Sequence, residues 1–203
     1  MNILLVHGMF DTGSIFKKLE GALAKLGHRC FAPSLQPADG RYGIPDLAQK
    51  LDRLVNEFFS PEEDLVIIGF SMGCIVSRYY MQHLGAARRI RAFFAISGPH
   101  RGSLLAYLYP GKGAHDLRPG SALLRNLDLL DLHAINVPTH TYWTPFDLMV
   151  VPSTSSRWLP ACETIIWSLL HPLMPSNHRL CNDIIKKIGL LEIPQRCQPD
   201  EQS

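Results

Sequence analysis

The stretch DLVIIGFSMGCIVSRYY, residues 64–80, decides the fold class of this chain. Its apolar run at 65–68 predicts a buried strand, and the amphipathic run at 73–83 predicts a helix that Gly85 ends. Between them stands GFSMG, residues 69–73. A Gly-x-Ser-x-Gly sequence between a strand and a helix is typical of a sharp turn that exposes its serine.

The same alternation of apolar and helix-period runs continues along the chain. Strands are expected at 2–6, 28–35, 65–68, 90–97, 139–143 and 163–167, and helices at 14–26, 45–59, 73–83 and 176–188. Ser14 and Ser176 are predicted to cap their helices, and Gly189 to end the last one. Strands that are apolar on both faces predict an α/β fold: a three-layer α/β/α arrangement with a mostly parallel sheet of about six strands.

The composition suits one globular domain. The chain has 203 residues, of which 46% are hydrophobic and 19% charged, and its formal net charge is +2. Without a basic stripe we expect no nucleic-acid binding. The five cysteines are scattered and form no CxxC pair, so we expect reduced thiols and neither a disulfide framework nor a zinc site.

The ends of the chain carry further expectations. The apolar start lacks a basic segment and a cleavage site, so we expect no signal peptide and a cytoplasmic protein. No apolar stretch is long enough to span a membrane. The domain is expected over residues 1–190, followed by a polar, flexible tail at 191–203.

Residues 99–131 interrupt the alternation with an early loop rich in proline, glycine and histidine, followed by SALLRNLDLLDL. A long excursion between two strands is often a lid or a binding surface. An ordinary helical crossover with a long leading loop fits the pattern equally well, and both interpretations stay open.

Ser71 is the candidate nucleophile. The turn leaves room only for small residues on either side of the serine, and Gly69 and Gly73 meet that demand. The backbone N–H of Met72 would then point to a developing oxyanion, supported by the positive end of the helix. The alternative is a glycine-bordered turn without chemistry.

A second oxyanion donor comes from the loop after an earlier strand in sites of this kind. The stretch LLVHGM supplies that loop: Gly8 lets the backbone turn, and the N–H of Met9 is the candidate donor. His7 is expected to hydrogen-bond within the loop rather than to act as the base.

The chain has nine histidines, and one of them is expected to be the general base. A base must reach the serine from a loop at the carboxyl edge of the sheet, which favours His171 over His178 in the first turn of the closing helix. His100 follows a strand end and is a candidate for lining the site. The expected acid is Asp147, just beyond the strand at 139–143. Its alternative role is that of a turn residue, and its rivals are Asp116, Asp128 and Asp131.

The order Ser71, Asp147, His171 is the order found in α/β-hydrolases. With the anchors LLVHGM, GFSMG, YWTPFDLMVVP and HPLMPSNHRLCNDI, the chain resembles that superfamily over residues 2–188, and within it small bacterial serine lipases and esterases such as the Bacillus lipase A type. The resemblance aligns His171 with the family's catalytic histidine and implies the compact α/β-hydrolase fold. Family members of this type have a shorter excursion and are secreted.

The expected activity is hydrolysis of carboxylic esters with an apolar acyl chain through an acyl-enzyme on Ser71. Phe10, His100, Leu104 and Leu148 are the candidate substrate-lining residues. A small-molecule ester or acyl group is the expected partner, with transient contact to a lipid surface, and no metal or cofactor is needed. The alternatives are a thioesterase or acyltransferase using the same residues, and a binding protein without catalysis.

Overall fold

Six strands form one sheet in the computed structural model, which describes residues 1–130, 137–158 and 161–192. Their spatial order is β2-β1-β3-β4-β5-β6, and every neighbouring pair is parallel. The strands are β1 (Asn2–Val6), β2 (Arg29–Phe31), β3 (Leu65–Phe70), β4 (Ile90–Ile96), β5 (Thr139–Trp143) and β6 (Cys162–Ile165). The predicted parallel sheet of about six strands is confirmed.

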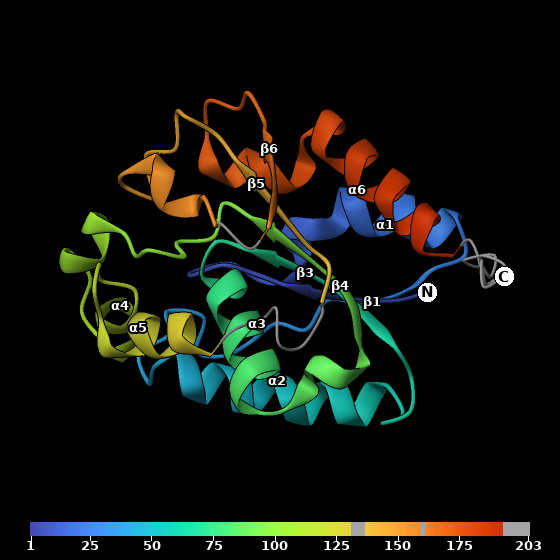
Figure 1. The fold of residues 1–203 in the computed structure, drawn as a ribbon, viewed down its shortest axis with the longest axis horizontal. Coiled ribbons are helices and arrows are strands. Elements are labelled where there is room, and N and C mark those ends of the chain that lie inside the picture. Colours follow the sequence, from blue (N-terminus) through green and yellow to red (C-terminus); the bar gives the residue numbers. More distant parts are fainter. Residues whose placement is uncertain (131–136, 159–160, 193–203) are drawn as a thin grey trace, which may run out of the picture.

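Helices cover both faces of the sheet, as Figure 1 shows. One face carries α1 (Lys17–Lys25) and α6 (His178–Leu191), and the other carries α2 (Ile44–Phe58) and α3 (Met72–His83). The N-terminus lies at the right of Figure 1, and the excursion helices α4 (Lys112–Asp116) and α5 (Ala122–Leu129) lie at the left, beyond the carboxyl ends of the strands.

Alternate residues of the central strands enter two separate cores. Ile3 and Leu5 of β1 pack with the helices of the α1–α6 face, whereas Leu4 and Val6 pack with α2 and α3. All four side chains are fully buried. The twofold side-chain period of a strand, combined with helices on both sides, explains why these strands are apolar at every position.

Three predicted element ends were wrong. Helix α1 begins at Lys17, after a 3-10 turn at Gly13–Phe16, so Ser14 does not cap it. Helix α6 is capped by Asn177, whose side chain accepts hydrogen bonds from the N–H groups of Arg179 and Leu180, and Ser176 lies in the preceding 3-10 turn. The last helix also continues past Gly189 to Leu191.

The described part of the excursion is tied to its neighbours. Ser103 donates a hydrogen bond to the carbonyl of Met149 (2.9 Å) and accepts one from the N–H of Val151 (3.0 Å). Residue Gln82 of α3 donates to the carbonyl of Leu127 in α5 (2.9 Å). Residues 99–130 therefore pack as a crossover against α3 and against the loop that follows β5.

A buried cation also joins α3 to the excursion. Arg78 is 1% exposed, its guanidinium lies 4.4 Å from the centre of the Trp158 ring, and it pairs with Asp128 of α5 at 2.9 Å. An unpaired charge at this depth would cost several kcal/mol, on the order of 3–5. The pair therefore couples the position of α5 to the helix that follows Ser71.

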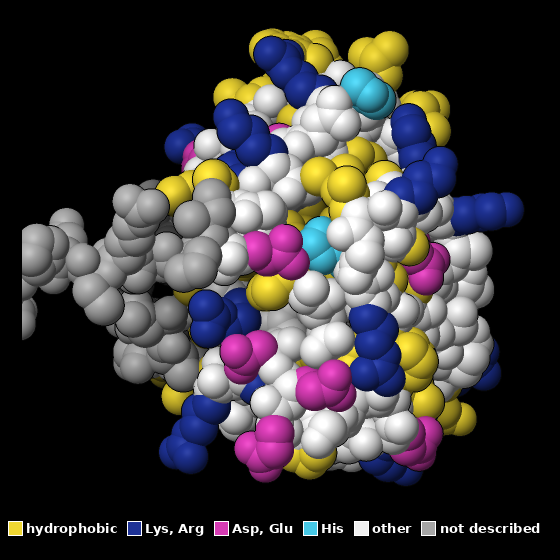
Figure 2. All heavy atoms as spheres, turned by 90° about the vertical axis from the view of Figure 1, so that its right-hand side faces the viewer, with side chains coloured by type: hydrophobic (Ala, Val, Ile, Leu, Met, Phe, Trp, Pro, Cys, Tyr) yellow, Lys and Arg dark blue, Asp and Glu magenta, His cyan; other side chains and the backbone are white. Residues whose placement is uncertain are grey.

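The edge where the strands begin carries charges of both signs, as Figure 2 shows. Arg29 pairs with Glu63 at 3.2 Å, and Arg91 pairs with Asp64 at 3.4 Å. The described cysteines, at positions 30, 74, 162 and 181, are free. Asp131, His133, Cys197 and most of the predicted tail lie outside the described residues.

Because Gly189 lies inside α6 rather than at its end, replacing it with alanine is expected to stabilise the protein. A Cβ there meets no atom within 4 Å, and alanine in a helix interior is favoured over glycine by about 1 kcal/mol. Urea denaturation should show this gain in the free energy of unfolding. The control is Gly85→Ala, which should destabilise because φ is +74° at that position. A loss of stability in Gly189→Ala would contradict the position of Gly189 in the helix.

Candidate active site

Ser71 joins β3 to α3 in a strained turn. Its φ of 53° and ψ of −125° lie in a region that residues with side chains rarely adopt. A Cβ on Gly73 would lie 2.1 Å from the carbonyl oxygen of Val6, and a Cβ on Gly69 would lie 2.9 Å from the Cα of Cys74. Only glycine at these two positions lets the turn close against β1.

Two backbone N–H groups lie free beside this turn. Met72 is the first residue of α3, where the helix offers its N–H no acceptor. Met9 follows Gly8, and a Cβ on Gly8 would lie 3.0 Å from the Cβ of Ser71. Within the described residues neither N–H donates a hydrogen bond to another group. Both predicted donors therefore lie on the backbone segments that flank Ser71.

His7 holds the Gly8 loop in place. Its Nε2 accepts a hydrogen bond from the N–H of Leu35 (2.8 Å), so the proton must sit on Nδ1, which donates to the carbonyl of Gly8 (2.8 Å). Burial lowers the pKa of this imidazole. A neutral ring locked at both nitrogens is a structural element, which agrees with the prediction that His7 is not the base.

Asp147 and His171 are in direct contact, although 24 residues separate them in the chain. The His171 Nδ1 lies 2.7 Å from Asp147 Oδ2, and both side chains are buried. Asp147 Oδ1 accepts the N–H groups of Met149 and Val150, each at 2.9 Å. Burial alone would raise the pKa of Asp147, but the hydrogen bonds from His171 and the two N–H groups outweigh it, and the pKa is lowered.

His171 also lies close to the serine turn. Its ring centre is 4.8 Å from that of Phe70, the residue directly before Ser71. In the described part of the chain no hydrogen bond joins Ser71 Oγ to His171. The structure thus brings the acid and the base into contact and leaves the imidazole beside the serine turn, in the looser arrangement that sites without substrate often have.

Thr144 links the loops that carry Asp147 and His171, and the sequence analysis did not identify it. Its fully buried hydroxyl donates to the carbonyl of Ser168 (2.7 Å) and accepts the N–H groups of Ser168 (3.4 Å) and Phe146 (3.3 Å). These bonds fasten the start of the loop after β5 to the loop after β6. A threonine at a strand end carries no sequence signal for such a role.

The rival residues have other partners. His178 is exposed at the start of α6, where its Nδ1 lies 3.3 Å from the side-chain nitrogen of Asn182. Asp116 accepts the N–H of Ile44 at 2.9 Å, and Asp128 pairs with Arg78. None of these three side chains contacts His171 or Ser71, so the geometry favours Asp147 and His171.

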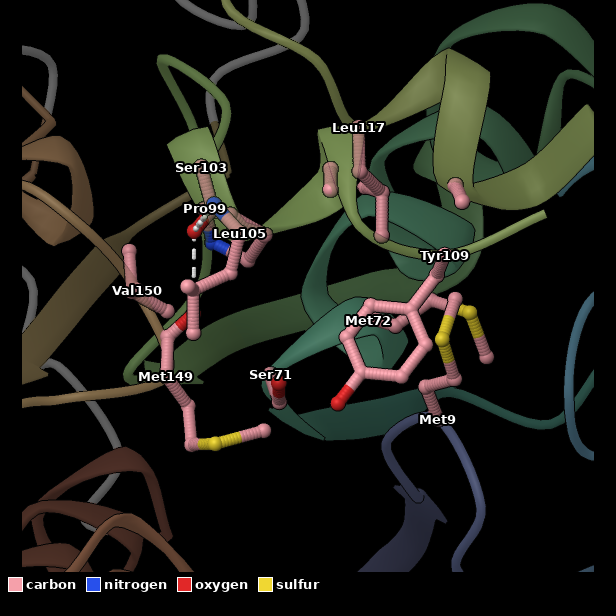
Figure 3. A pocket seen from close by; sticks show the side chains of 12 residues that line it. Met9, Ser71, Met72, Pro99, Ser103, Leu105, Tyr109, Leu117, Met149 and Val150 are labelled. Atoms are coloured by element: carbon pink, nitrogen blue, oxygen red, sulfur yellow. Dashed lines mark hydrogen bonds between the residues drawn. The ribbon is translucent and has the colours of Figure 1, made fainter.

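An apolar pocket of about 70 Å³ opens beside Ser71, as Figure 3 shows. In that view Ser71 lies between the side chains of Met149 and Tyr109. The excursion supplies much of the wall. The lining residues are Met9, Ser71, Met72, Pro99, Ser103, Leu105, Ala106, Tyr109, Ala114, Leu117, Met149 and Val150.

The four predicted lining residues lie elsewhere. Phe10, Leu104 and Leu148 are exposed outside the pocket, each next to a chain neighbour that does line it. His100 is buried and stacks on Trp158, with ring centres 4.7 Å apart. Burial, assisted by the nearby charge of Arg78, lowers the pKa of His100 well below its usual value, so this ring is neutral and part of the core.

Asp11, which is not among the predicted site residues, also lies close to the serine turn. A Cβ on Gly8 would lie 3.3 Å from Asp11 Oδ2 and 3.0 Å from the Cβ of Ser71. The carboxylate and the serine side chain therefore both lie close to Gly8. Burial raises the pKa of Asp11, while the neighbouring imidazoles of His7 and His171 act in the opposite direction. Its carboxylate forms no ion pair within the described residues.

Among residues 1–130, 137–158 and 161–192, no group of three or more His, Cys, Asp or Glu side chains is placed to hold a metal ion. In the same ranges, no helix combines the length and the apolar character needed to cross a bilayer.

Comparison with solved structures shows proteins of similar fold. The chain is similar in structure to the mature lipase BlEst2 of Bacillus licheniformis (TM-score 0.72, 18% identity, covering 95% of this chain and 92% of that one). It is also similar to a pyrethroid hydrolase of Sphingobium faniae (0.62, 15%, 96% and 98%) and to a polyneuridine aldehyde esterase variant (0.65, 16%, 92% and 98%).

At such identities these likenesses show the fold alone. No curated protein matches the chain in sequence. The family comparison is decisive, because residues 3–179 match the alpha/beta hydrolase family. The chain therefore belongs to the alpha/beta hydrolase family.

Proposed function

We propose that this protein is a serine hydrolase that cleaves carboxylic esters with an apolar acyl chain. The observation that carries the proposal is the 2.7 Å contact between His171 and Asp147, two side chains from separate loops that meet beside the strained Ser71 turn. A buried carboxylate with a lowered pKa fixes the imidazole with Nδ1 protonated, which leaves Nε2 free to accept a proton.

In this mechanism the proton of Ser71 Oγ–H moves to His171 Nε2 as Oγ bonds to the ester carbonyl carbon. The carbonyl oxygen becomes an oxyanion that accepts the N–H groups of Met9 and Met72. His171 then gives its proton to the leaving alkoxide as the ester C–O bond breaks. Water, deprotonated by the same imidazole, releases the acyl group from Ser71.

The pocket favours a substrate with an apolar acyl group of limited length. Its walls are largely methionine, leucine, alanine and valine side chains, and its volume is about 70 Å³. Each methylene that enters such a wall contributes about 0.8 kcal/mol. Binding energy should therefore rise along a series of acyl chains until the pocket is full.

Ser71→Ala is expected to abolish ester hydrolysis. Removal of a serine nucleophile lowers kcat by about a millionfold, so purified variant should fall below detection on p-nitrophenyl butyrate. Wild-type enzyme should prefer the butyrate ester to the acetate ester. The control is Ser60→Ala, which should keep full turnover because Ser60 is an exposed residue in the loop that precedes β3. Undiminished hydrolysis by Ser71→Ala would refute the nucleophile assignment.

Thr144→Val is expected to lower kcat about tenfold with little change in KM, which corresponds to about 1.4 kcal/mol of transition-state stabilisation. Valine keeps the shape of threonine but leaves the carbonyl of Ser168 without its donor, so the loops of Asp147 and His171 lose a shared anchor. Steady-state kinetics of Thr144→Val and Thr144→Ser separate this role from a loss of folding, because serine restores the hydroxyl. Equal activity of the two variants would count against Thr144 as a positioning residue.

Asp11→Asn is expected to change selectivity by charge. The carboxylate beside Ser71 repels anionic substrates, so its removal should raise kcat/KM for an ester bearing a carboxylate, relative to its neutral isostere, by roughly threefold to tenfold at pH 8. Asp64→Asn, at the opposite edge of the sheet, is the matched control. An unchanged ratio in Asp11→Asn would show that this charge does not face the substrate.

A further inference from the structure

Large apolar side chains are exposed on the loops at the carboxyl end of the sheet, the end that carries the pocket. We call this set the apolar rim. Its six residues are Phe10, Leu108, Phe146, Leu148, Trp167 and Leu169, and they are between 47% and 76% exposed. They come from the four loops that follow β1, β4, β5 and β6. Large apolar side chains gathered at one edge of a protein mark an interaction surface.

Contacts between aromatic rings join these loops in two pairs. The ring of Phe10 lies 5.7 Å from that of Tyr109, which lines the pocket, and the ring of Phe146 lies 5.7 Å from that of Trp167. The first contact links the β1 loop to the excursion, and the second links the β5 loop to the β6 loop. Ser103 of the excursion also hydrogen-bonds Met149 and Val151 of the β5 loop, so the four loops are joined at the end of the sheet that carries Ser71.

The excursion adds positive charge to the same edge. Its described part carries four basic residues, Arg101, Lys112, Arg118 and Arg125, against the acidic residues Asp116 and Asp128. Asp128 already pairs with Arg78, and Asp116 accepts a backbone N–H. Among the described residues the four basic side chains form no ion pair. This excess of positive charge is complementary to an anionic surface.

We propose that the apolar rim docks on the surface of an anionic phospholipid bilayer, which delivers the acyl substrate to Ser71. Trp, Tyr and Phe side chains favour the boundary between headgroups and acyl chains, and arginine and lysine favour anionic headgroups. A protein partner seated on the rim would instead seal the pocket opening. The proposal names a partner for the proposed hydrolase site and rests on that function only for the delivery step.

The test measures binding apart from catalysis, on the full-length Ser71→Ala protein. We expect it to sediment with vesicles of equal parts phosphatidylcholine and phosphatidylglycerol, more weakly with pure phosphatidylcholine, and more weakly still in high salt. The double variant Leu108→Ser/Trp167→Ser in the same background should bind at least about tenfold more weakly, since two large apolar side chains no longer leave water.

The matched control is Leu26→Ser in that background, because Leu26 is also a largely exposed apolar residue (59%) but follows α1 at the opposite edge. It should bind vesicles as the parent does, and circular dichroism should show all variants folded. Parent-like binding by the double variant would overturn the proposal. So would an absence of vesicle binding in a protein that elutes as a dimer and becomes monomeric in the double variant. Failure of ester hydrolysis in the wild type would leave this result unchanged and would count only against the proposed function.

Discussion

The close approach of α3 to the end of β1 is the constraint on which the site depends. A Cβ at Gly73 would lie 2.1 Å from the carbonyl oxygen of Val6 and 2.5 Å from that of His7. Because β1 and β3 are neighbours in the sheet, this contact presses the serine turn against the Gly8 loop. The N–H groups of Met9 and Met72 then flank the same side chain, although Val6 and Gly69, which pair at the ends of the two strands, are 63 residues apart in the chain.

Asp147 shows how one carboxylate can bind a turn and an imidazole together. Its two oxygens have different partners: Oδ1 accepts the N–H groups of Met149 and Val150, and Oδ2 contacts His171. The turn holds the carboxylate in a single orientation, so little conformational freedom is lost when it orients the imidazole. The two interpretations of Asp147 that the sequence left open are therefore compatible in the structure.

Local signals account for what could be predicted from the sequence. Apolar runs identify the strands, and the steric demand of the turn identifies Gly69, Ser71 and Gly73. Element ends were less predictable, since the choice between Ser176 and Asn177 as a cap depends on a single residue of register. Glycine often follows the end of a helix, which predicts an end at Gly189, whereas α6 continues to Leu191.

Residues whose role depends on distant contacts were missed. Thr144 matters through Ser168, 24 residues later, and Asp11 through its approach to Gly8 and Ser71. His100 was placed in the site because it follows a strand end, as active-site residues often do. Its stacking on Trp158 depends on the path of a loop after β5, which no pattern near His100 indicates.

The pocket and the apolar rim are built from the same short segments. Leu104 is exposed while Leu105 lines the pocket, Leu108 is exposed while Tyr109 lines it, and Leu148 is exposed while Met149 lines it. One short segment thus presents apolar side chains both outward and toward the pocket. Both sets are simply hydrophobic residues in the sequence, so no local pattern distinguishes the exposed side chains from those that line the pocket.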